Sequence, residues 1–414
     1  MVRRSSARST PTTRSSPRFR RRTPAREGRL DRPHRAGAHV GLLTGTLPDF
    51  PWDTLVPYGD RARRHPDGIV DLSVGTPVDP TPPLVRAALA EAADAPGYPT
   101  THGTPRLRRA VVEWFARRRG VVGLDPDAVL PTVGSKELVA LLPSLLGLGE
   151  GDVVVHPEAA YPTYDVGARL AGATPLPADD VASWADRDDV RLVWVNSPSN
   201  PTGAVLGVEQ LRDVVRTARE RGAVVVSDEC YALLAWDEPW ATTGVPSVLD
   251  PRVCEGSHDG VLAVHSLSKQ SNLAGYRAAF VAGDLRLVRR LLEVRKHAGM
   301  IVPAPVQAAT AAALDDDAHV DAQRERYRRR RAVLKAGLEA AGLVVDGSPA
   351  GLYLWARAAG AGQDCWATVG DLADLGILVA PGAFYGPAGA RHVRVALTAS
   401  DDDVARAAAR LAGA

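Results

Sequence analysis

Between about residues 130 and 300 the chain alternates continuous apolar runs with helical patterns. The apolar runs are short and rich in β-branched residues, which is typical of strands buried on both faces. The runs are Asp152–His156, Leu192–Asn196, Val224–Glu229, Val261–Ser266 and Ala278–Gly283. Helical patterns such as Glu137–Leu148 and Gly207–Arg221 separate several of them. This alternation predicts an α/β fold with a mostly parallel sheet.

Both flanks of this region have a different pattern. Residues 81–120 carry a helical period that breaks at Gly97–Gly103, and residues 284–340 are helical. The remaining expected elements are three short strands and one amphipathic helix, at Gly351–Ala356, Gly376–Ala380, His392–Leu397 and Asp401–Leu411. We therefore predict a large α/β domain over residues 86–296. We expect both ends of the chain, residues 41–85 and 297–414, to build a smaller α+β domain.

The first 40 residues are strongly basic. They hold twelve arginines but only two acids, Glu27 and Asp31, so their net charge is about +10, whereas the remainder carries about −8. They are rich in Ser, Pro and Thr and have no apolar period, which predicts a disordered basic extension. A nucleic-acid-binding tail and a transit peptide remain alternatives. The segment is too short and too polar for a winged-helix DNA-binding domain, so we expect no nucleic-acid partner.

The rest of the composition is that of an ordinary globular protein, with 45% hydrophobic and 24% charged residues. No apolar run is long enough to cross a membrane. The three cysteines are Cys230, Cys254 and Cys365, and they form no metal-binding or disulfide pattern. We expect a cytoplasmic protein without a metal site.

Lysine is rare in this chain, with four lysines against 46 arginines. A lysine that survives such a bias is slightly favoured to stand where only an amine will serve. Lys269 directly follows a predicted buried strand, at the edge of the sheet where α/β proteins bind ligands. A Schiff-base lysine requires an amine with a lowered pKa in a shielded site of this kind, and an ordinary lysine at a strand end is the alternative. Ser266 and Arg277, on either side of it, could hold a phosphate.

Polar residues also follow the neighbouring strands. Asp228 ends a buried strand, where a carboxylate is costly without a partner, and it could pair with a protonated pyridine nitrogen. Tyr231 could hydrogen-bond a phenolic oxygen of the same ring. Asn200, in the loop Asn196–Gly203 (NSPSNPTG), could donate to a ring oxygen through its amide. A helix cap or a salt bridge is the simpler explanation for Asp228, and a common turn for the loop.

Two further segments precede these residues. Gly134, Ser135 and Lys136 lead into a helix predicted to begin near Glu137, and helix N-termini bind phosphate. A helix cap by Ser135 explains the same residues. Tyr161 follows a strand end and could stack on an aromatic cofactor or simply pack in the core.

The order of these residues resembles that of the class I/II aminotransferases of pyridoxal-phosphate (PLP) fold type I, over nearly all of residues 47–414. The resemblance implies a seven-stranded, mostly parallel sheet flanked by helices, PLP as cofactor, and amino acid and 2-oxo acid substrates. It implies that Lys269 binds PLP covalently and moves the substrate proton. The residues implied to contact PLP are Tyr98, Gly134, Ser135, Lys136, Tyr161, Asn200, Asp228, Tyr231, Ser266, Ser268, Lys269 and Arg277.

The same resemblance assigns the substrate side. Arg394 matches the arginine that grips the substrate α-carboxylate, with Arg391 as a weaker competitor, and bidentate recognition favours arginine over lysine. Gly75 matches the glycine whose backbone approaches that carboxylate, and Asn200 is shared with the substrate. Tyr98 matches a tyrosine that reaches the partner subunit's phosphate, which implies a homodimer with shared active sites. Trp52, Tyr353 and Tyr385 are guesses for the substrate pocket, with core packing as the alternative.

Within the family, several stretches resemble the succinyldiaminopimelate aminotransferases of high-GC bacteria, including residues 47–55, 68–82, 351–356 and 379–397. This implies glutamate as amino donor and N-succinyl-2-amino-6-oxopimelate as acceptor, in lysine and diaminopimelate biosynthesis. The alternatives are another class I/II aminotransferase (aromatic, branched or aspartate-type) and a PLP-dependent C–S lyase. A PLP-binding transcription regulator is a remote alternative.

Overall fold

The computed structural model describes residues 47–48, 51–360 and 362–413. The predicted basic extension over residues 1–40 lies outside the described residues. The described residues belong to one unit, Leu43–Ala414. Within the described ranges, no helix combines the length and the apolar character that crossing a bilayer requires.

The centre of the unit is a seven-stranded sheet in the order β2-β8-β7-β6-β5-β3-β4. Only β8 runs antiparallel to its neighbours, β2 and β7, so the predicted mostly parallel sheet is confirmed. The strands are β2 (Val129–Val133), β3 (Val153–His156), β4 (Thr174–Pro177), β5 (Val190–Asn196), β6 (Val224–Asp228), β7 (Val261–Ser266) and β8 (Ala278–Gly283). The five predicted runs match β3, β5, β6, β7 and β8.

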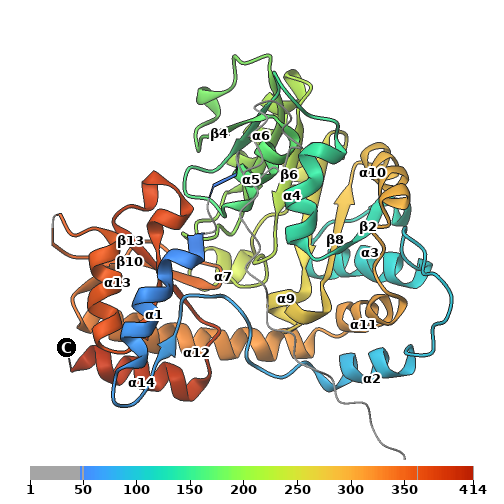
Figure 1. Cartoon of the computed structure of the whole chain (residues 1–414). Helices are drawn as coiled ribbons and strands as arrows, with labels where there is room; N and C mark the ends of the chain where they lie inside the picture. Colours follow the sequence, from blue (N-terminus) through green and yellow to red (C-terminus); the bar gives the residue numbers. More distant parts are fainter. Residues whose placement is uncertain (1–46, 49–50, 361, 414) are drawn as a thin grey trace, which may run out of the picture. The chain divides into compact units, whose positions relative to one another are not determined.

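Helices cover both faces of this sheet, and alternate residues of each strand point to opposite faces. Val193 and Val195 of β5 pack with one core, whereas Leu192 and Trp194 pack with the other. The first core also receives α3 (Pro105–Arg119), α6 (Val208–Glu220) and α11 (Ala304–Asp315). The second receives α4 (Ser135–Leu145), α5 (Thr163–Ala171) and α10 (Leu285–Ala298). Figure 1 shows α4, α5 and α10 at the same side of the sheet.

A separate apolar core forms around a four-stranded antiparallel sheet in the order β12-β13-β10-β9. Its strands are β9 (Leu343–Val345), β10 (Tyr353–Ala358), β12 (Ala380–Pro381) and β13 (His392–Ala396). β1 (Val70–Asp71) pairs in parallel with β11 (Ile377–Leu378), so the N-terminal lead-in joins the C-terminal region. The helices of this region are α1 (Val56–Arg63), α12 (Ala318–Ala340), α13 (Cys365–Asp374) and α14 (Asp401–Ala412). The exact domain boundaries at residues 85 and 297 remain predictions.

The remaining helices are short or lie at the edges of these cores. They are α2 (Pro83–Glu91), α7 (Trp240–Thr243), α8 (Pro251–Cys254) and α9 (Leu267–Gln270). The helical pattern expected at residues 81–120 is therefore present as α2 and α3, on either side of the predicted break. The long helix α12 contacts both α14 and α9, as Figure 1 shows, and it thus connects the four-stranded region with the end of β7.

Candidate active site

A cavity of about 540 Å³ opens where the carboxyl ends of the central strands meet the four-stranded sheet. Most of the predicted site residues line it, from segments as far apart as residues 75 and 394. The predicted residues in its wall are Gly75, Ser135, Lys136, Tyr161, Asn200, Asp228, Tyr231, Ser266, Ser268, Lys269, Arg277 and Arg394. Parallel strands place the residues that follow them at one edge, which explains why loops after β5, β6 and β7 meet here.

Lys269 lies on α9, the single turn that follows β7. Burial lowers the pKa of its amine, and the guanidinium groups of Arg394 and Arg277 lower it further. The amine donates a hydrogen bond to the backbone carbonyl of Gly75. The Lys269 amine is therefore shielded from solvent and faces two guanidinium groups, a setting that suits covalent capture of a carbonyl compound.

Asp228 ends β6 inside the cavity and is buried. Burial raises the pKa of its carboxyl group, although hydrogen bonds from the Cys230 side chain, the Tyr164 hydroxyl and the Cys230 backbone oppose this rise. The hydroxyl of Tyr164 donates at 2.9 Å and the backbone N–H of Cys230 at 3.2 Å. A buried carboxylate of this kind is strongly stabilised by a cationic partner such as a protonated ring nitrogen.

An anion cradle forms at the start of α4. The helix begins at Ser135, earlier than predicted, and Gly134 is its N-cap without any side-chain capping bond. The explanation that Ser135 caps the helix is therefore wrong, because Ser135 is the first helical residue. Arg277 lies against Gly134, and the backbone carbonyl of Arg277 accepts the N–H of Gly134 at 2.8 Å. A Cβ at residue 134, where φ is +77°, would collide with the Arg277 guanidinium, so only glycine leaves room for this approach.

Two serines complete this part of the wall. The hydroxyl of Ser266 donates to the hydroxyl of Ser268 at 2.8 Å, and Ser266 also caps the turn α9. Lys136 lies with its amine 5.8 Å from the centre of the Tyr161 ring. Hydroxyls, a helix N-terminus and a guanidinium group together form a site of the type that binds phosphate.

Arg394 occupies the opposite side of the cavity and is only 3% exposed. Its guanidinium donates to Oδ1 of Asn200 at 2.9 Å and to the backbone carbonyl of Ser73 at 2.7 Å. Its Nε has no hydrogen-bond partner within the described chain, and no acidic side chain there forms an ion pair with it. Since a buried guanidinium without a carboxylate is poorly compensated, the site is suited to a ligand that brings one.

Two aromatic rings hold Arg394 in this position. Its guanidinium carbon lies 3.9 Å from the ring centre of Tyr353 and 4.9 Å from that of Tyr385. Tyr353 and Trp52 line the cavity, whereas Tyr385 packs behind Arg394 and does not. Arg391, the weaker candidate for the same role, is exposed and bonds only the carbonyl of Gly360 among the described residues.

The remaining polar contacts of the cavity lie between the phosphate-type cradle and Arg394. The hydroxyls of Tyr231 and Tyr353 are 3.3 Å apart. Asn200 receives a hydrogen bond from Arg394 through Oδ1, which leaves its amide nitrogen as the donor for a ligand. The backbone N–H of Asn200 is fixed by Oδ1 of Asn196 at 2.7 Å.

Two predicted cofactor residues are not in the cavity wall. Gly134 lies behind Arg277, as described above. The Tyr98 side chain is 100% exposed and does not line the cavity of its own chain. Its predicted contact with a partner subunit remains a prediction.

Sequence reasoning assigned no role to four polar residues of the wall. They are Thr76, Tyr164, Asn196 and Cys230. Tyr164 is the second tyrosine of the segment that contains Tyr161, three residues further on. A buried Asp228 requires a hydrogen-bond donor, and this requirement could have indicated a hydroxyl partner in the sequence. It could not tell which hydroxyl supplies the bond.

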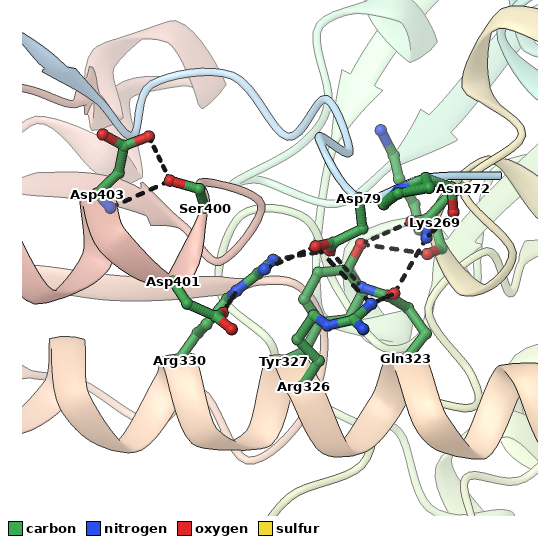
Figure 2. A network of polar contacts seen from close by, with 11 residues as sticks. Asp79, Lys269, Asn272, Gln323, Arg326, Tyr327, Arg330, Ser400, Asp401 and Asp403 are labelled. Carbon is green, nitrogen blue, oxygen red and sulfur yellow. Dashed lines mark hydrogen bonds and ion pairs between the residues drawn. The ribbon is translucent and has the colours of Figure 1, made fainter.

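A network on one face of α12 supports the turn that carries Lys269 (Figure 2). The hydroxyl of Tyr327 donates to the backbone carbonyl of Lys269 at 3.3 Å. Nδ2 of Asn272 donates to Oε1 of Gln323 at 3.0 Å, and Nε2 of Gln323 donates to Asp79 at 2.8 Å. The network therefore links the lysine turn with the segment that carries Gly75.

Asp79 is the centre of this network. Arg330 donates to both of its carboxylate oxygens, at 2.8 and 2.7 Å, and its Nε donates to Asp401 of α14 (Figure 2). Although burial alone would raise the pKa of Asp79, its bonds from Arg330 and Gln323 hold that pKa below the ordinary value. The pairing fixes the Asp79 segment against α12.

The cavity thus contains a shielded amine, a buried carboxylate, a phosphate-type cradle and a guanidinium group without an acid. These groups match the aldehyde, the pyridine nitrogen and the phosphate of PLP, and the carboxylate of an amino acid. Within the described residues, no three His, Cys, Asp or Glu side chains gather as a metal site would require.

The chain belongs to the class I and II aminotransferases, because the sequence profile of this family matches residues 67–411. Enzymes of this family and fold depend on PLP. The chain is 61% identical over 388 residues to a probable aminotransferase, Rv1178, of Mycobacterium tuberculosis, covering 94% of this chain and 90% of the relative. It is 59% identical over 365 residues to the 4-dedimethylamino-4-oxo-anhydrotetracycline transaminase OxyQ of Streptomyces rimosus, covering 88% and 99%.

A solved structure supports the same fold. The probable N-succinyldiaminopimelate aminotransferase of Thermus thermophilus is similar with a TM-score of 0.78 and 29% identity, covering 88% of this chain and 100% of that one. The protein is therefore a PLP-dependent aminotransferase of fold type I that acts on amino acids and 2-oxo acids.

Proposed function

We propose that Lys269 binds PLP and moves the substrate α-proton during transamination. The single observation that carries this proposal is the position of its amine, between the cradle at Arg277 and the unpaired guanidinium of Arg394. When bound, PLP supplies an electron-withdrawing ring that stabilises negative charge at the substrate α-carbon. A lowered pKa leaves more of the Lys269 amine unprotonated and so able to act as a general base.

The surrounding residues have complementary parts in this proposal. Asp228 would hold a proton on the ring nitrogen, and Tyr164 keeps the carboxylate of Asp228 in place. Asn200 and Tyr231 would donate hydrogen bonds to the ring oxygen, and Tyr161 would pack on the ring. The N-terminus of α4 would hold the phosphate, together with Gly134, Ser135, Lys136, Ser266, Ser268 and Arg277.

Arg394 is proposed to hold the α-carboxylate of the donor and then that of the acceptor. Both compounds carry this group on the carbon that reacts, so one arginine orients both half-reactions at one site. The Gly75 backbone borders the same space, and its carbonyl accepts the hydrogen bond of Lys269. Binding of a substrate there would place the α-proton within reach of the amine.

For the substrates, we propose glutamate as donor and N-succinyl-2-amino-6-oxopimelate as acceptor, in lysine and diaminopimelate biosynthesis. The four sequence stretches that resemble this subgroup support the proposal, as does the similarity to the Thermus protein with that name. A second candidate acceptor is a polycyclic ketone, because the OxyQ relative, 59% identical, acts on one. Both candidates use the same cofactor residues, but the ketone has no carboxylate on its carbonyl carbon for Arg394 to hold.

The acceptor is tested by loading the enzyme with glutamate and measuring 2-oxoglutarate release with a panel of acceptors. The panel contains the succinylated oxopimelate, an anhydrotetracycline ketone, and aromatic, branched and C4-dicarboxylic 2-oxo acids. We expect the highest kcat/KM with the succinylated compound. A higher kcat/KM with any other acceptor would overturn this specificity.

We also propose a homodimer in which Tyr98 of each subunit reaches the partner's phosphate site. Its side chain is 100% exposed in the single chain, which is unusual for a tyrosine and supports a role in an interface. Light scattering should give twice the chain mass. If the protein is dimeric, Tyr98→Phe should weaken PLP binding several-fold, and a fully active monomer would contradict the proposal.

A further inference from the structure

Tyr353 lies where the ring side and the carboxylate side of the cavity meet. It begins β10, is 4% exposed and lines the cavity. Its ring packs on the Arg394 guanidinium at 3.9 Å, and its hydroxyl lies 3.3 Å from that of Tyr231. No other described side chain contacts both of these residues in this way. Packing on Arg394 requires only the ring of Tyr353, so it does not explain why the Tyr353 hydroxyl lies beside the hydroxyl of Tyr231.

We propose that Tyr353 is a positioning residue that donates its hydroxyl proton to Tyr231 and so makes Tyr231 a stronger donor to the cofactor. This inference rests on the proposed function, because it takes Lys269 and Tyr231 to be at PLP. Hydrogen bonds in a chain polarise one another, so the donor at its start strengthens the one at its end. Tyr353 would act on the cofactor only through Tyr231.

The direction of this bond follows from the surroundings of the two phenols. Burial alone would raise the pKa of Tyr353, but the positive charges of Arg394 and Lys269 hold it below the ordinary value. Burial raises the pKa of Tyr231 well above its ordinary value. The Arg394 guanidinium lies 3.9 Å from the ring centre of Tyr353, and a positive charge beside a phenol makes that phenol a better donor, which favours Tyr353 as the donor and Tyr231 as the acceptor. The proton of Tyr231 then stays available for the ring oxygen.

The hydroxyl of Tyr353 is also held in place by the backbone. A Cβ at residue 75 would collide with it, so the absence of a side chain at Gly75 leaves the space that the hydroxyl fills. The rings of Tyr231 and Tyr353 lie 5.8 Å apart at 70°, an edge-to-face contact that fixes their mutual angle. The titratable groups that face Tyr353 are Lys269, Arg394, Tyr231, Cys230, Tyr327 and Tyr385.

The proposal predicts the sign of a measurable shift. In the loaded enzyme, the ring oxygen of PLP would share a proton with the nitrogen of Lys269. Once that proton is lost, a hydrogen bond to the ring oxygen would stabilise the negative charge of this oxygen. Weakening that bond therefore favours the protonated form. Removing the Tyr353 hydroxyl should raise the pH midpoint of the visible absorbance change of the PLP-loaded enzyme.

The test is an absorbance titration of the holoenzyme with Tyr353→Phe. We expect the midpoint to rise by about 0.5 to 1 pH unit, the size of one net hydrogen bond. Tyr385→Phe is the matched control, since Tyr385 packs on the other side of Arg394 and its hydroxyl has no partner among the described residues. Its midpoint should stay at the wild-type value. An unchanged midpoint in Tyr353→Phe, or an equal shift in both variants, would overturn the proposal.

A double variant separates an effect through Tyr231 from a general one. In the Tyr231→Phe background, Tyr353→Phe should cause no further shift, because the hydroxyl through which it acts is gone. A full additional shift would show that Tyr353 acts directly. Lys269→Ala separates a failure of the proposed function from a failure of the inference about Tyr353. Persistence of the pH-dependent absorbance in that variant would refute the proposed function itself. Loss of that absorbance, with no shift in Tyr353→Phe, would refute only this inference.

Discussion

The two sides of the cavity are built in different ways. The cofactor side, with Ser135, Asp228, Lys269 and Arg277, comes from turns that directly adjoin strands of the central sheet. The carboxylate side, with Tyr353 and Arg394, comes from the four-stranded sheet and meets a segment far away in the chain: Arg394 bonds the carbonyl of Ser73, 321 residues earlier in the sequence.

The hydrogen bonds of the two sides differ accordingly. Asp228 and Gly134 are fixed by nearby donors and backbone groups, so the cofactor side is preorganised. Arg394 has two hydrogen bonds and two aromatic rings, but its Nε has no partner in the described chain. The comparison indicates that the buried charge of Asp228 already receives hydrogen bonds from the chain, whereas the buried charge of Arg394 keeps an Nε that only a ligand could satisfy.

The largest effect should come from Lys269→Ala on the cofactor side. We expect turnover to fall by at least about 10⁴-fold, because both the covalent partner and the proton acceptor are lost. Measured glutamate half-reaction rates test this, and circular dichroism should show an unchanged fold. Normal transamination by the variant would refute the assignment of Lys269.

On the carboxylate side, Arg394→Lys should lower kcat/KM roughly a hundredfold for donor and acceptor alike, since a lysine cannot bind a carboxylate in a fork. Steady-state kinetics with both substrates measure this. The matched control is Arg391→Lys, three residues earlier and exposed, which should leave kcat/KM unchanged. A loss for only one substrate would show that Arg394 does not hold the group they share.

Gly134→Ala tests the cradle, with an expected loss of about tenfold in PLP affinity. A methyl group there would displace the Arg277 guanidinium, and φ of +77° disfavours alanine. Gly120→Ala is the control, because φ is +67° but nothing lies within 4 Å of the added carbon. It should lower stability by about 1 kcal/mol and leave PLP affinity unchanged. Equal PLP losses in both would indicate backbone strain as the sole cause.

The smallest effect should come from Tyr327→Phe, in the network that joins the two sides. Its hydroxyl bonds the backbone carbonyl of Lys269 and the side chain of Asn272, at 3.3 and 3.4 Å, and Tyr327 itself does not line the cavity. We therefore expect a loss of about 1 kcal/mol in unfolding free energy and at most about a threefold fall in kcat. Chemical denaturation and kinetics measure the two. A loss in kcat as large as that of Arg394→Lys would mean that the network controls the chemistry.

The sequence predicted the central strands well but not the edges of the sheet. The five apolar runs became β3, β5, β6, β7 and β8, since continuous β-branched runs have few alternatives to a buried strand. β4 was missed because it is Thr-Pro-Leu-Pro, and proline disfavours a strand except at an edge. β2 also contains a proline, Pro131, and pairs only with β8. At such edges tertiary pairing decides what local pattern cannot.

By itself, the sequence determined which residues stand at the ends of the central strands, and thus most of the cofactor side. The reason is geometric: parallel strands bring the residues that follow them to one edge. Only the tertiary structure decided the contacts of Arg394, the partnership of Tyr353 with Tyr231, the bond from Tyr164 to Asp228 and the network on α12. These contacts depend on how two sheets and a helix pack across long sequence distances, and no local pattern encodes such packing.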